Sequence, residues 1–422
     1  MLLSFKVKNF RSFKDEQGIS FVLEKDERIE RVRRFEVKTK NGNLRILKNA
    51  IIYGANASGK TNILLALRTL NHIIMHQTLS DNSGLFVDTF AYNKDNTRFE
   101  VKFLREDAIF EYHLEYKHEE VVWESLYKDD TIVFERNHQA FTFPNLDDAV
   151  KSLLKTVRKT GLLIFFAQSY NVEEAKDAFS WFYDSFYAAG TNMIKALKTD
   201  KDFKEKILYA LQFADFNILD IEVEERQPIS SIDEREIMLL ENAVKLAEGR
   251  ERYERIERSL LERINNELTK IYFIHENNGI KYRIPLQNES EGTKAYFETI
   301  LLLLNPNKAS RTFLFRDELD LSLHKGLTYN LVEFLNSEKN AIQFISTSHD
   351  SSLMNLLSKH QIYFVQKNTS GESEIFKLSD FNDIGKTRSD TKYAPKYEAG
   401  LFGAEPIIND AGLMSIFGAS HE

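Results

Sequence analysis

The chain has 422 residues, 42% of them hydrophobic and 28% charged, which is typical of a globular protein large enough for a sizeable core. The formal net charge of -8 argues against a protein that binds nucleic acid over its whole surface, although a local basic face could exist. The absence of cysteine excludes disulfides and thiolate metal sites. Because the N-terminus lacks a signal-peptide core and the apolar runs are too short to cross a bilayer, we expect a cytoplasmic protein.

The N-terminal part of the sequence predicts strands followed by one helix and a series of hairpins. Apolar residues alternate over residues 3–7, and a short apolar run extends from Asn49 to Tyr53. A helical pattern follows from Gly59 to about Met75. Residues 86–143 then alternate repeatedly between apolar and polar, with turn residues between the runs. This alternation predicts antiparallel β-hairpins.

Further along the chain, helices precede a return to strands. Residues 179–214 are helical in pattern, and the longest helical stretch is residues 232–271, where apolar residues recur every three or four positions. The long stretch fits a packed helical insertion, and a short coiled-coil arm for a partner is the alternative. Apolar runs bounded by turns then predict buried strands of a largely parallel sheet at residues 312–315, 343–347 and 362–365.

A phosphate-binding loop is the most specific motif in the sequence. The segment from Gly54 to Thr61 matches G-x-x-x-x-G-K-S/T, and it has an apolar strand before it and a helix after it, as this motif requires. Its backbone N–H groups and the helix N-terminus can surround the phosphates of ATP. Lys60 is expected to reach the β- and γ-phosphates, and Thr61 to bind Mg²⁺. The nucleotide-binding residues predicted here are Gly54, Asn56, Ala57, Ser58, Gly59, Lys60, Thr61 and Asn62.

Two carboxylates end the predicted strand at residues 312–315. Asp317 can hold Mg²⁺ through water, and Glu318 can activate or orient the attacking water. Successive side chains at a strand end point in different directions, so two separate roles are natural. An Asp-Glu pair alone is usually solvated surface, but with the phosphate loop it predicts the acidic half of an ATPase site.

Two further motifs indicate the ABC class of P-loop proteins. Ser290 and Gly292 precede a helical run, where they could bind the γ-phosphate of a nucleotide held by a second subunit, or form an ordinary helix cap. His349 follows the strand at residues 343–347 and could hydrogen-bond the γ-phosphate or the lytic water. The segment around Ser322 is expected at the dimer seam. Lys60, Glu318 and His349 are the predicted catalytic residues.

The order of these motifs resembles the ABC-type ATPases of the SMC, RecF and OLD lineage. It is similar above all to bacterial ATP-binding proteins of phage-defence loci, the AbiL-type ATPase partner and the ATPase of PARIS systems. The segments that carry the resemblance are Asn9 to Phe13, Gly54 to Asn62, Glu289 to Lys294, Asp317 to His324, Thr347 to Asp350 and Tyr397 to Pro406.

This resemblance implies an α/β fold: an ABC-type P-loop ATPase head with a mixed sheet, an antiparallel β-hairpin subdomain and a helical insertion. It divides the chain into an N-terminal lobe (1–145), the insertion (146–271) and a C-terminal lobe (272–422). Arg11 and Ser12 are implied to contact the nucleotide, and Gln77 is a candidate for the glutamine loop by its order alone. ATP and Mg²⁺ are the implied cofactors, bound between two copies of the chain.

Three functions are compatible with this resemblance. The leading one is a slow defence ATPase that senses a phage protein or DNA and controls a separate effector such as a nuclease or toxin. Residues 350–422 show no acidic Toprim pattern, so a nuclease is expected in trans. The second is a DNA-repair ATPase like RecF, for which the basic stretch Arg28 to Lys40 is the main evidence. The third is a scaffold that uses ATP only as a clamp. No membrane partner is expected.

Overall fold

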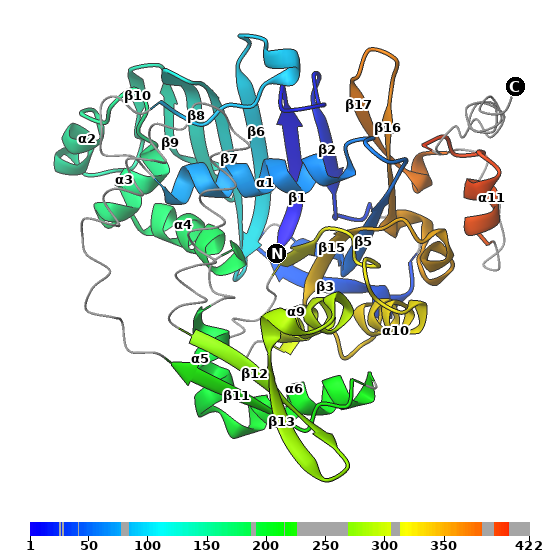
Figure 1. Ribbon diagram of the computed structural model, residues 1–422. Coiled ribbons are helices and arrows are strands. Elements are labelled where there is room, and N and C mark those ends of the chain that lie inside the picture. The colour runs from blue at the N-terminus through cyan, green and yellow to red at the C-terminus, as the bar shows by residue number, and fades with distance from the viewer. Residues whose placement is uncertain are drawn as a thin grey trace, which may run out of the picture. The chain divides into compact units, whose positions relative to one another are not determined.

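The computed structural model describes residues 1–24, 27, 29–40, 42–76, 84–186, 191–214, 216–225, 269–304, 313–381 and 392–404 (Figure 1). The chain forms two compact units. The first combines Met1–Ala188 with Lys308–Glu422, and the second is Ala189–Asn307. These boundaries differ from the division expected at residues 145 and 271, because the helices before Ala189 pack with the first unit and the strands from Thr269 pack with the second.

A five-stranded sheet of order β14-β15-β5-β16-β17 lies in the first unit. Its first four strands are parallel, and β17 pairs antiparallel with β16. Every residue of β5 and β15 is buried, as expected for central strands of a parallel sheet. The strands are β5 (Asn49–Tyr53), β14 (Phe313–Arg316), β15 (Gln343–Thr347), β16 (Ile362–Lys367) and β17 (Ser373–Lys377). The predicted parallel strands are confirmed.

A seven-stranded antiparallel sheet of order β10-β9-β8-β7-β6-β1-β2 is the other large sheet of this unit. Buried residues alternate with less buried ones along β6 and β7, so one face packs on the core. The predicted hairpins are therefore confirmed. The strands are β1 (Leu2–Lys8), β2 (Gln17–Ser20), β6 (Thr97–Arg105), β7 (Ala108–Lys117), β8 (Glu120–Lys128), β9 (Thr131–Asn137) and β10 (Ala140–Thr142).

Helices join these two sheets into one core. Helix α1 (Lys60–Met75) runs across the antiparallel strands in Figure 1 and packs on β1. Helix α4 contacts both β6 and β14, and its Trp181 ring stacks on Phe103 at 4.2 Å and on Phe313 at 6.4 Å. The other helices are α2 (Asp148–Leu154), α3 (Leu163–Ser169), α4 (Glu173–Phe186), α10 (Lys325–Leu335) and α11 (Ala394–Glu398).

Short elements complete the first unit. The buried side chain of Gln343 on β15 accepts a hydrogen bond from the backbone N–H of Leu2 at 2.7 Å and donates one to the Leu2 carbonyl at 2.9 Å, which ties β1 to the parallel sheet. A two-stranded sheet pairs β3 (Arg34–Thr39) with β4 (Gly42–Leu47). The 3-10 helices are Arg31–Arg33, Phe90–Tyr92, Ser351–Leu356, Lys359–Gln361 and Leu378–Asp380.

The second unit packs helices on a three-stranded antiparallel sheet of order β11-β12-β13. The Phe273 and Phe297 rings meet edge to face at 5.0 Å. The unit contains α5 (Thr191–Thr199), α6 (Lys201–Phe213), β11 (Asp220–Glu225), β12 (Thr269–Asn277), β13 (Ile280–Pro285), a 3-10 helix (Leu286–Asn288) and α9 (Glu291–Leu304).

The long helix predicted over residues 232–271 falls mostly outside the described residues. Its last three positions, 269–271, are the start of β12, so the prediction is wrong there. Ile271 begins the run Ile271 to Ile274, whose β-branched and aromatic side chains suit a half-buried strand, and it pairs with Val223 of β11. Among the described helices, none is both long and apolar enough to span a membrane.

Candidate functional site

The loop between β5 and α1 has the curled backbone that the phosphate-loop motif predicts. Gly54 has φ +153° and Gly59 has φ +107°, conformations that other residues rarely adopt. A Cβ atom on Gly54 would lie 2.3 Å from the Val365 carbonyl oxygen and 2.8 Å from Ser58 Oγ, so no larger residue fits. Ala57 also has a left-handed φ of +60°. Asn56 and Ala57 are exposed, whereas Thr61 and Asn62 are half-buried in the first turn of α1.

Lys60 is buried inside this loop. Its Nζ donates hydrogen bonds to the carbonyl oxygens of Gly54 at 2.9 Å and Ala55 at 3.0 Å. Burial lowers the pKa of Lys60 below its ordinary value, and the nearby carboxylates of Asp317 and Glu318 oppose this shift. The loop lysine and the acidic strand end therefore lie within electrostatic reach of each other, as an ATPase site requires.

The Asp317 carboxylate and the Glu318 backbone, which follow β14, are held by the neighbouring strand. Thr347 at the end of β15 donates its hydroxyl proton to Asp317 Oδ1 at 2.5 Å, and its Oγ1 accepts a hydrogen bond from the backbone N–H of Glu318 at 2.7 Å. Glu318 has φ +50°, an uncommon conformation for a residue with a side chain. In the part of the chain that the structure describes, no cation forms an ion pair with Asp317 or Glu318.

His349 is two residues beyond the end of β15. Its backbone N–H donates to the Asp320 carboxylate at 3.2 Å, and the backbone N–H of Ser348 donates to the Ile52 carbonyl at 3.1 Å. The His349 side chain is exposed and makes no hydrogen bond with the described residues. Because β14, β15 and β5 are parallel neighbours, the segments that follow them meet at one edge of the sheet.

The segment after β1 is joined to this edge by side-chain hydrogen bonds. Arg11 Nε donates to Asp88 Oδ2 at 2.9 Å, and Arg11 Nη1 donates to Asn62 Oδ1 at 3.3 Å. Asn62 Nδ2 in turn donates to Ser12 Oγ at 2.7 Å. Arg11 also has a left-handed backbone, with φ +51°. The structure thus brings Arg11 and Ser12 together with α1, the helix that begins at the phosphate loop.

Ser290 and Gly292 belong to the second unit. Ser290 Oγ accepts a hydrogen bond from the Thr293 backbone N–H at 3.1 Å, which is the geometry of an N-cap on α9. The residue before it, Glu289, is hydrogen-bonded to His275 Nε2 at 2.8 Å. Ser290 is exposed, so its capping role leaves the helix N-terminus accessible. Gln77, the glutamine-loop candidate, lies outside the described residues.

Three residues to which the sequence analysis assigned no role support the predicted ones. Thr347 binds the Asp317 carboxylate and the Glu318 backbone N–H, Asp320 accepts a hydrogen bond from the backbone N–H of His349, and Asp88 pairs with Arg11. Thr347 could have been found, because a hydroxyl at the end of the strand beside the acidic one is well placed to bind a carboxylate. Asp88 carries no sequence signal, since it meets Arg11 only through the fold.

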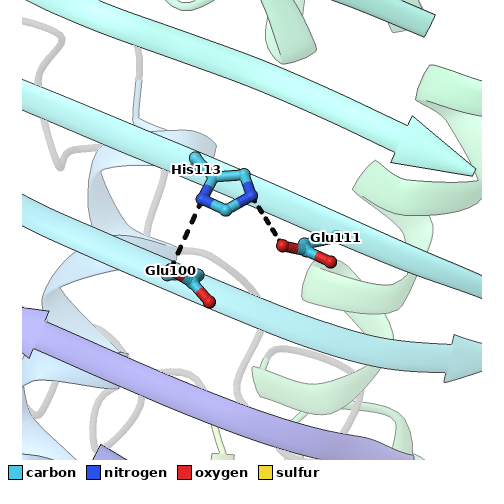
Figure 2. A group of neighbouring side chains, drawn as sticks. All are labelled: Glu100, Glu111 and His113. Carbon is cyan, nitrogen blue, oxygen red and sulfur yellow. Dashed lines mark ion pairs between the residues drawn. The ribbon is translucent and has the colours of Figure 1, made fainter. Parts of the chain in front are cut away.

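One group elsewhere in the first unit has the residue types of a metal site. Glu100, Glu111 and His113 lie side by side on β6 and β7, and each nitrogen of the His113 ring faces a different carboxylate in Figure 2. Nε2 is 2.9 Å from Glu111, and Nδ1 is 3.7 Å from Glu100. Lys6 lies 3.0 Å from Glu100, and Lys102 lies 3.1 Å from Glu111. These ammonium groups already neutralise the carboxylates, so the group is an ion-pair network.

A phosphate loop after β5, two carboxylates after β14 and a histidine after β15 define a P-loop ATPase head of the ABC type, with the mixed α/β fold predicted from the sequence. Residues 50–355 match the family described as an AAA domain, putative AbiEii toxin, type IV TA system. The match covers more than half of the chain, and the protein belongs to this family.

Solved structures of SMC heads are similar over most of the chain. The Smc head bound to the C-winged helix domain of ScpA is 14% identical, with 89% of this chain and 97% of that chain covered and a TM-score of 0.40. The SMC head domain from Thermotoga maritima is 16% identical, with 89% and 98% covered and a TM-score of 0.37. An Smc head with an extended coiled coil, bound to the C-terminal domain of ScpA derived from Pyrococcus furiosus, is 13% identical, with 89% and 96% covered and a TM-score of 0.37. No curated protein matches the sequence.

Proposed function

We propose that the protein binds and hydrolyses ATP at the edge where β5, β14 and β15 end. The observation that carries this proposal is the buried ammonium of Lys60, which lies in a curled phosphate loop and within electrostatic reach of Asp317 and Glu318. A cation and two carboxylates in this arrangement can bind phosphates on one side and activate water on the other.

Each residue of the site is assigned a role by its position. The loop N–H groups from Gly54 to Lys60 bind the phosphates, and Lys60 exchanges the loop carbonyls for the β- and γ-phosphate oxygens. Arg11 and Ser12 contact the nucleotide beside α1. These residues provide hydrogen-bond donors, and the loop contains no acidic side chain that would repel phosphates. Such a loop suits the polyphosphate of a nucleotide.

Thr61 and Asp317 are the proposed ligands of Mg²⁺. The donor set fits a hard cation, because it consists of oxygens and because no side-chain cation is paired with Asp317 in the described part of the chain. When bound, Mg²⁺ would neutralise phosphate charge. Asp317 is held in place by Thr347, and Glu318 lies next in the chain with its carboxylate free of ion pairs with described residues.

Glu318 is the proposed general base. An ionised carboxylate can accept the proton of a water molecule as that water attacks the γ-phosphate. The left-handed backbone of Glu318 turns the chain after Asp317, so the two carboxylates need not point the same way. His349 is exposed at the end of the next strand, where its ring can donate a hydrogen bond to the γ-phosphate or to the water.

We infer that the site is completed by a second copy of the chain. Ser290 caps α9, a helix of 14 residues whose N-terminus favours an anion, and Gly292 in its first turn leaves room for a close approach. Both residues are proposed to contact the γ-phosphate of the partner's ATP, as the resemblance to ABC-type ATPases implies. ATP then holds two heads together, and hydrolysis releases them.

ATP turnover by two variants tests this assignment. Glu318→Gln is expected to bind ATP with unchanged affinity and to release phosphate at least about a hundredfold more slowly, because it lacks the base. Ser290→Arg is expected to bind ATP as a monomer and also to turn over slowly, because it cannot close on a second head. Normal turnover by Glu318→Gln would contradict the base assignment, and normal turnover by Ser290→Arg would contradict the composite site.

The biological role we propose is that of a cytoplasmic sensor ATPase in bacterial phage defence, which controls a separate nuclease or toxin. The support is the family itself, whose description names a toxin–antitoxin system, together with the resemblance to AbiL-type and PARIS-type ATPases. Capture of Glu318→Gln from cells that carry its neighbouring genes should yield a second protein in stoichiometric amount. Equal survival of phage challenge with wild type and with Lys60→Ala would contradict the defence role.

A RecF-like DNA-repair role is the alternative, and the described part of its basic stretch does not favour it. Arg33 and Arg34 form ion pairs with Glu30 and Glu36 at 2.9 Å each. Arg33 also donates to the Leu356 carbonyl. These arginines are therefore already partnered within the protein. DNA binding that strengthens with ATP and weakens with salt, without a captured protein partner, would support the repair role instead.

A further inference from the structure

The hairpin formed by β16 and β17 brings one buried hydroxyl to the phosphate loop. Ser373 is the first residue of β17 and is only 3% exposed. The turn before it is ordered by Asn368 Oδ1, which accepts hydrogen bonds from the backbone N–H groups of Ser370 and Glu372 at 2.9 Å each. These bonds hold the turn that leads into Ser373.

Ser373 contacts two segments of the nucleotide site at once. Its Oγ donates a hydrogen bond to the Ser58 carbonyl oxygen at 2.5 Å, and its backbone N–H donates to the Ser12 carbonyl at 2.7 Å. A Cβ atom on Gly59 would lie 2.6 Å from Ser373 Oγ, so the hydroxyl rests directly against the Gly59 backbone. The hairpin and the phosphate loop are therefore in direct contact.

The hydrogen bond to Ser58 fixes the direction of the next N–H group. In a trans peptide the carbonyl oxygen and the following N–H point in opposite directions within one plane, and this chain has no cis peptide bond among its described residues. When the Ser58 carbonyl points outward to Ser373, the N–H of Gly59 must point to the opposite side, into the curl of the loop. N–H groups of this loop bind the phosphates.

We propose that Ser373 is a positioning residue that aims the Gly59 N–H at the β-phosphate of the bound nucleotide. This inference rests on the proposed ATP site. The Ser373 hydroxyl acts through this one loop N–H, so its removal is expected to affect nucleotides that carry a β-phosphate, whereas the bond from the Ser373 backbone to Ser12 stays in place. The residue lies outside the 50–355 segment that matches the family.

A second contact fastens the same hairpin to the segment after β1. Lys14 Nζ lies 2.7 Å from Glu372 Oε1. The side chain of Lys14 is 52% exposed, so solvent screens this pair and its contribution is small. Of the two contacts, the buried hydroxyl of Ser373 is the one that bears on the phosphate loop, and the Lys14–Glu372 pair lies at the exposed turn of the hairpin.

The test compares the affinities of Ser373→Ala and wild type for ATP, ADP and AMP by competition against a fluorescent ADP analogue. Loss of one hydrogen bond is expected to weaken ATP and ADP binding by about tenfold and to leave AMP binding unchanged. The matched control is Ser370→Ala, which removes an exposed serine from the turn of the same hairpin and is expected to bind all three nucleotides like wild type.

Ser373→Cys guards against an effect of packing alone. The thiol is somewhat larger than the hydroxyl and a weak donor, so it fills the space without restoring the hydrogen bond, and the same selective loss for ATP and ADP is expected. Equal losses for all three nucleotides, or no loss in either variant, would overturn the positioning role while leaving the ATP site intact. If wild type binds no ADP, the proposed function fails and the positioning role fails with it.

Discussion

The two large sheets of the first unit use charge in opposite ways. On the antiparallel sheet, carboxylates lie beside cations on the paired strands, as Glu100 lies beside Lys6 and Glu111 beside Lys102. At the edge of the parallel sheet, Asp317 and Glu318 have no ion-pair partner among the described residues. The carboxylates of the antiparallel sheet are already neutralised by lysines of the same protein. The carboxylates of Asp317 and Glu318 remain available to a ligand.

Uncommon backbone conformations occur in the loops of the candidate site. Left-handed φ values are found at Arg11, in the connection between β1 and β2, and at Ala57 and Glu318. Similar values also occur in other turns of the antiparallel sheet, for example at Glu106 and Asp129. Uncommon backbone conformations inside the site mean that it is held in shape by its surroundings before a ligand arrives. The comparison predicts that substitutions in the two sheets affect different measurements.

The largest effect is expected from Lys60→Ala. The variant loses the buried ammonium that we propose binds the phosphates, so ATP affinity should fall by at least about a hundredfold. Titration with a fluorescent ATP analogue measures this affinity. The contrasting variant is Lys102→Ala on the antiparallel sheet, which should bind ATP like wild type. Similar ATP affinities for Lys60→Ala and Lys102→Ala would contradict the claim that only the charges at the edge of the parallel sheet serve ATP binding.

A smaller effect is expected from Thr347→Val, which keeps the shape of the side chain and removes its hydroxyl. Asp317 and the Glu318 backbone each lose a hydrogen bond, so kcat should fall by about tenfold while ATP affinity stays within about threefold. Phosphate release and ATP titration give the two values. Thr347→Ser retains the hydroxyl and should recover most of the rate, and a Ser variant as slow as Val would contradict the proposed role of these bonds.

The smallest effect is expected from Glu111→Gln, and it concerns stability alone. The hydrogen bond from His113, followed by that from Lys102, lowers the pKa of Glu111 from 4.5 to about 2. Ionised Glu111 therefore stabilises the fold above about pH 4.5, and this stabilisation is lost as the pH falls toward 2. Because solvent screens a partly exposed carboxylate, its removal should lower the free energy of unfolding by ~1–2 kcal/mol at pH 7.

Urea denaturation at several pH values measures that difference. The gap between wild type and Glu111→Gln should narrow steadily below about pH 4.5, because wild type then loses the charge that the variant lacks. ATP affinity should be unchanged in Glu111→Gln. A difference in unfolding free energy that stays constant with pH would show that Glu111→Gln destabilises the protein through packing and not through charge. A loss of ATP binding in this variant would show that the antiparallel sheet influences the nucleotide site.

Much of the first unit could be predicted from local patterns. The apolar run of β5, the helix after Gly59 and the alternating strands of the hairpins each carry their own periodicity, and all three are confirmed. The phosphate loop could be recognised because its glycines and lysine all lie within the eight residues from Gly54 to Thr61. The roles of its residues and of Glu318, His349 and Ser290 stay predictions.

The long-range contacts could not be predicted in the same way. Arg11 contacts Asp88, and Ser58 contacts Ser373, only because segments far apart in the sequence fold together, and no spacing in the sequence encodes such a contact. The division into two compact units also differs from the lobes expected from the resemblance. The strands β12 and β13 form a sheet with β11, which α5 and α6 contact, whereas their alternation looks like that of the strands in the first unit.

The most direct test of the central claim, that ATP joins two heads through this site, is the mass of Glu318→Gln in solution, measured by light scattering with and without ATP. We predict a monomer without nucleotide and a doubled mass with ATP, and no doubling when Ser290→Arg is added to the same chain. A mass that is unchanged by ATP, or a doubling that persists with Ser290→Arg, would contradict the account.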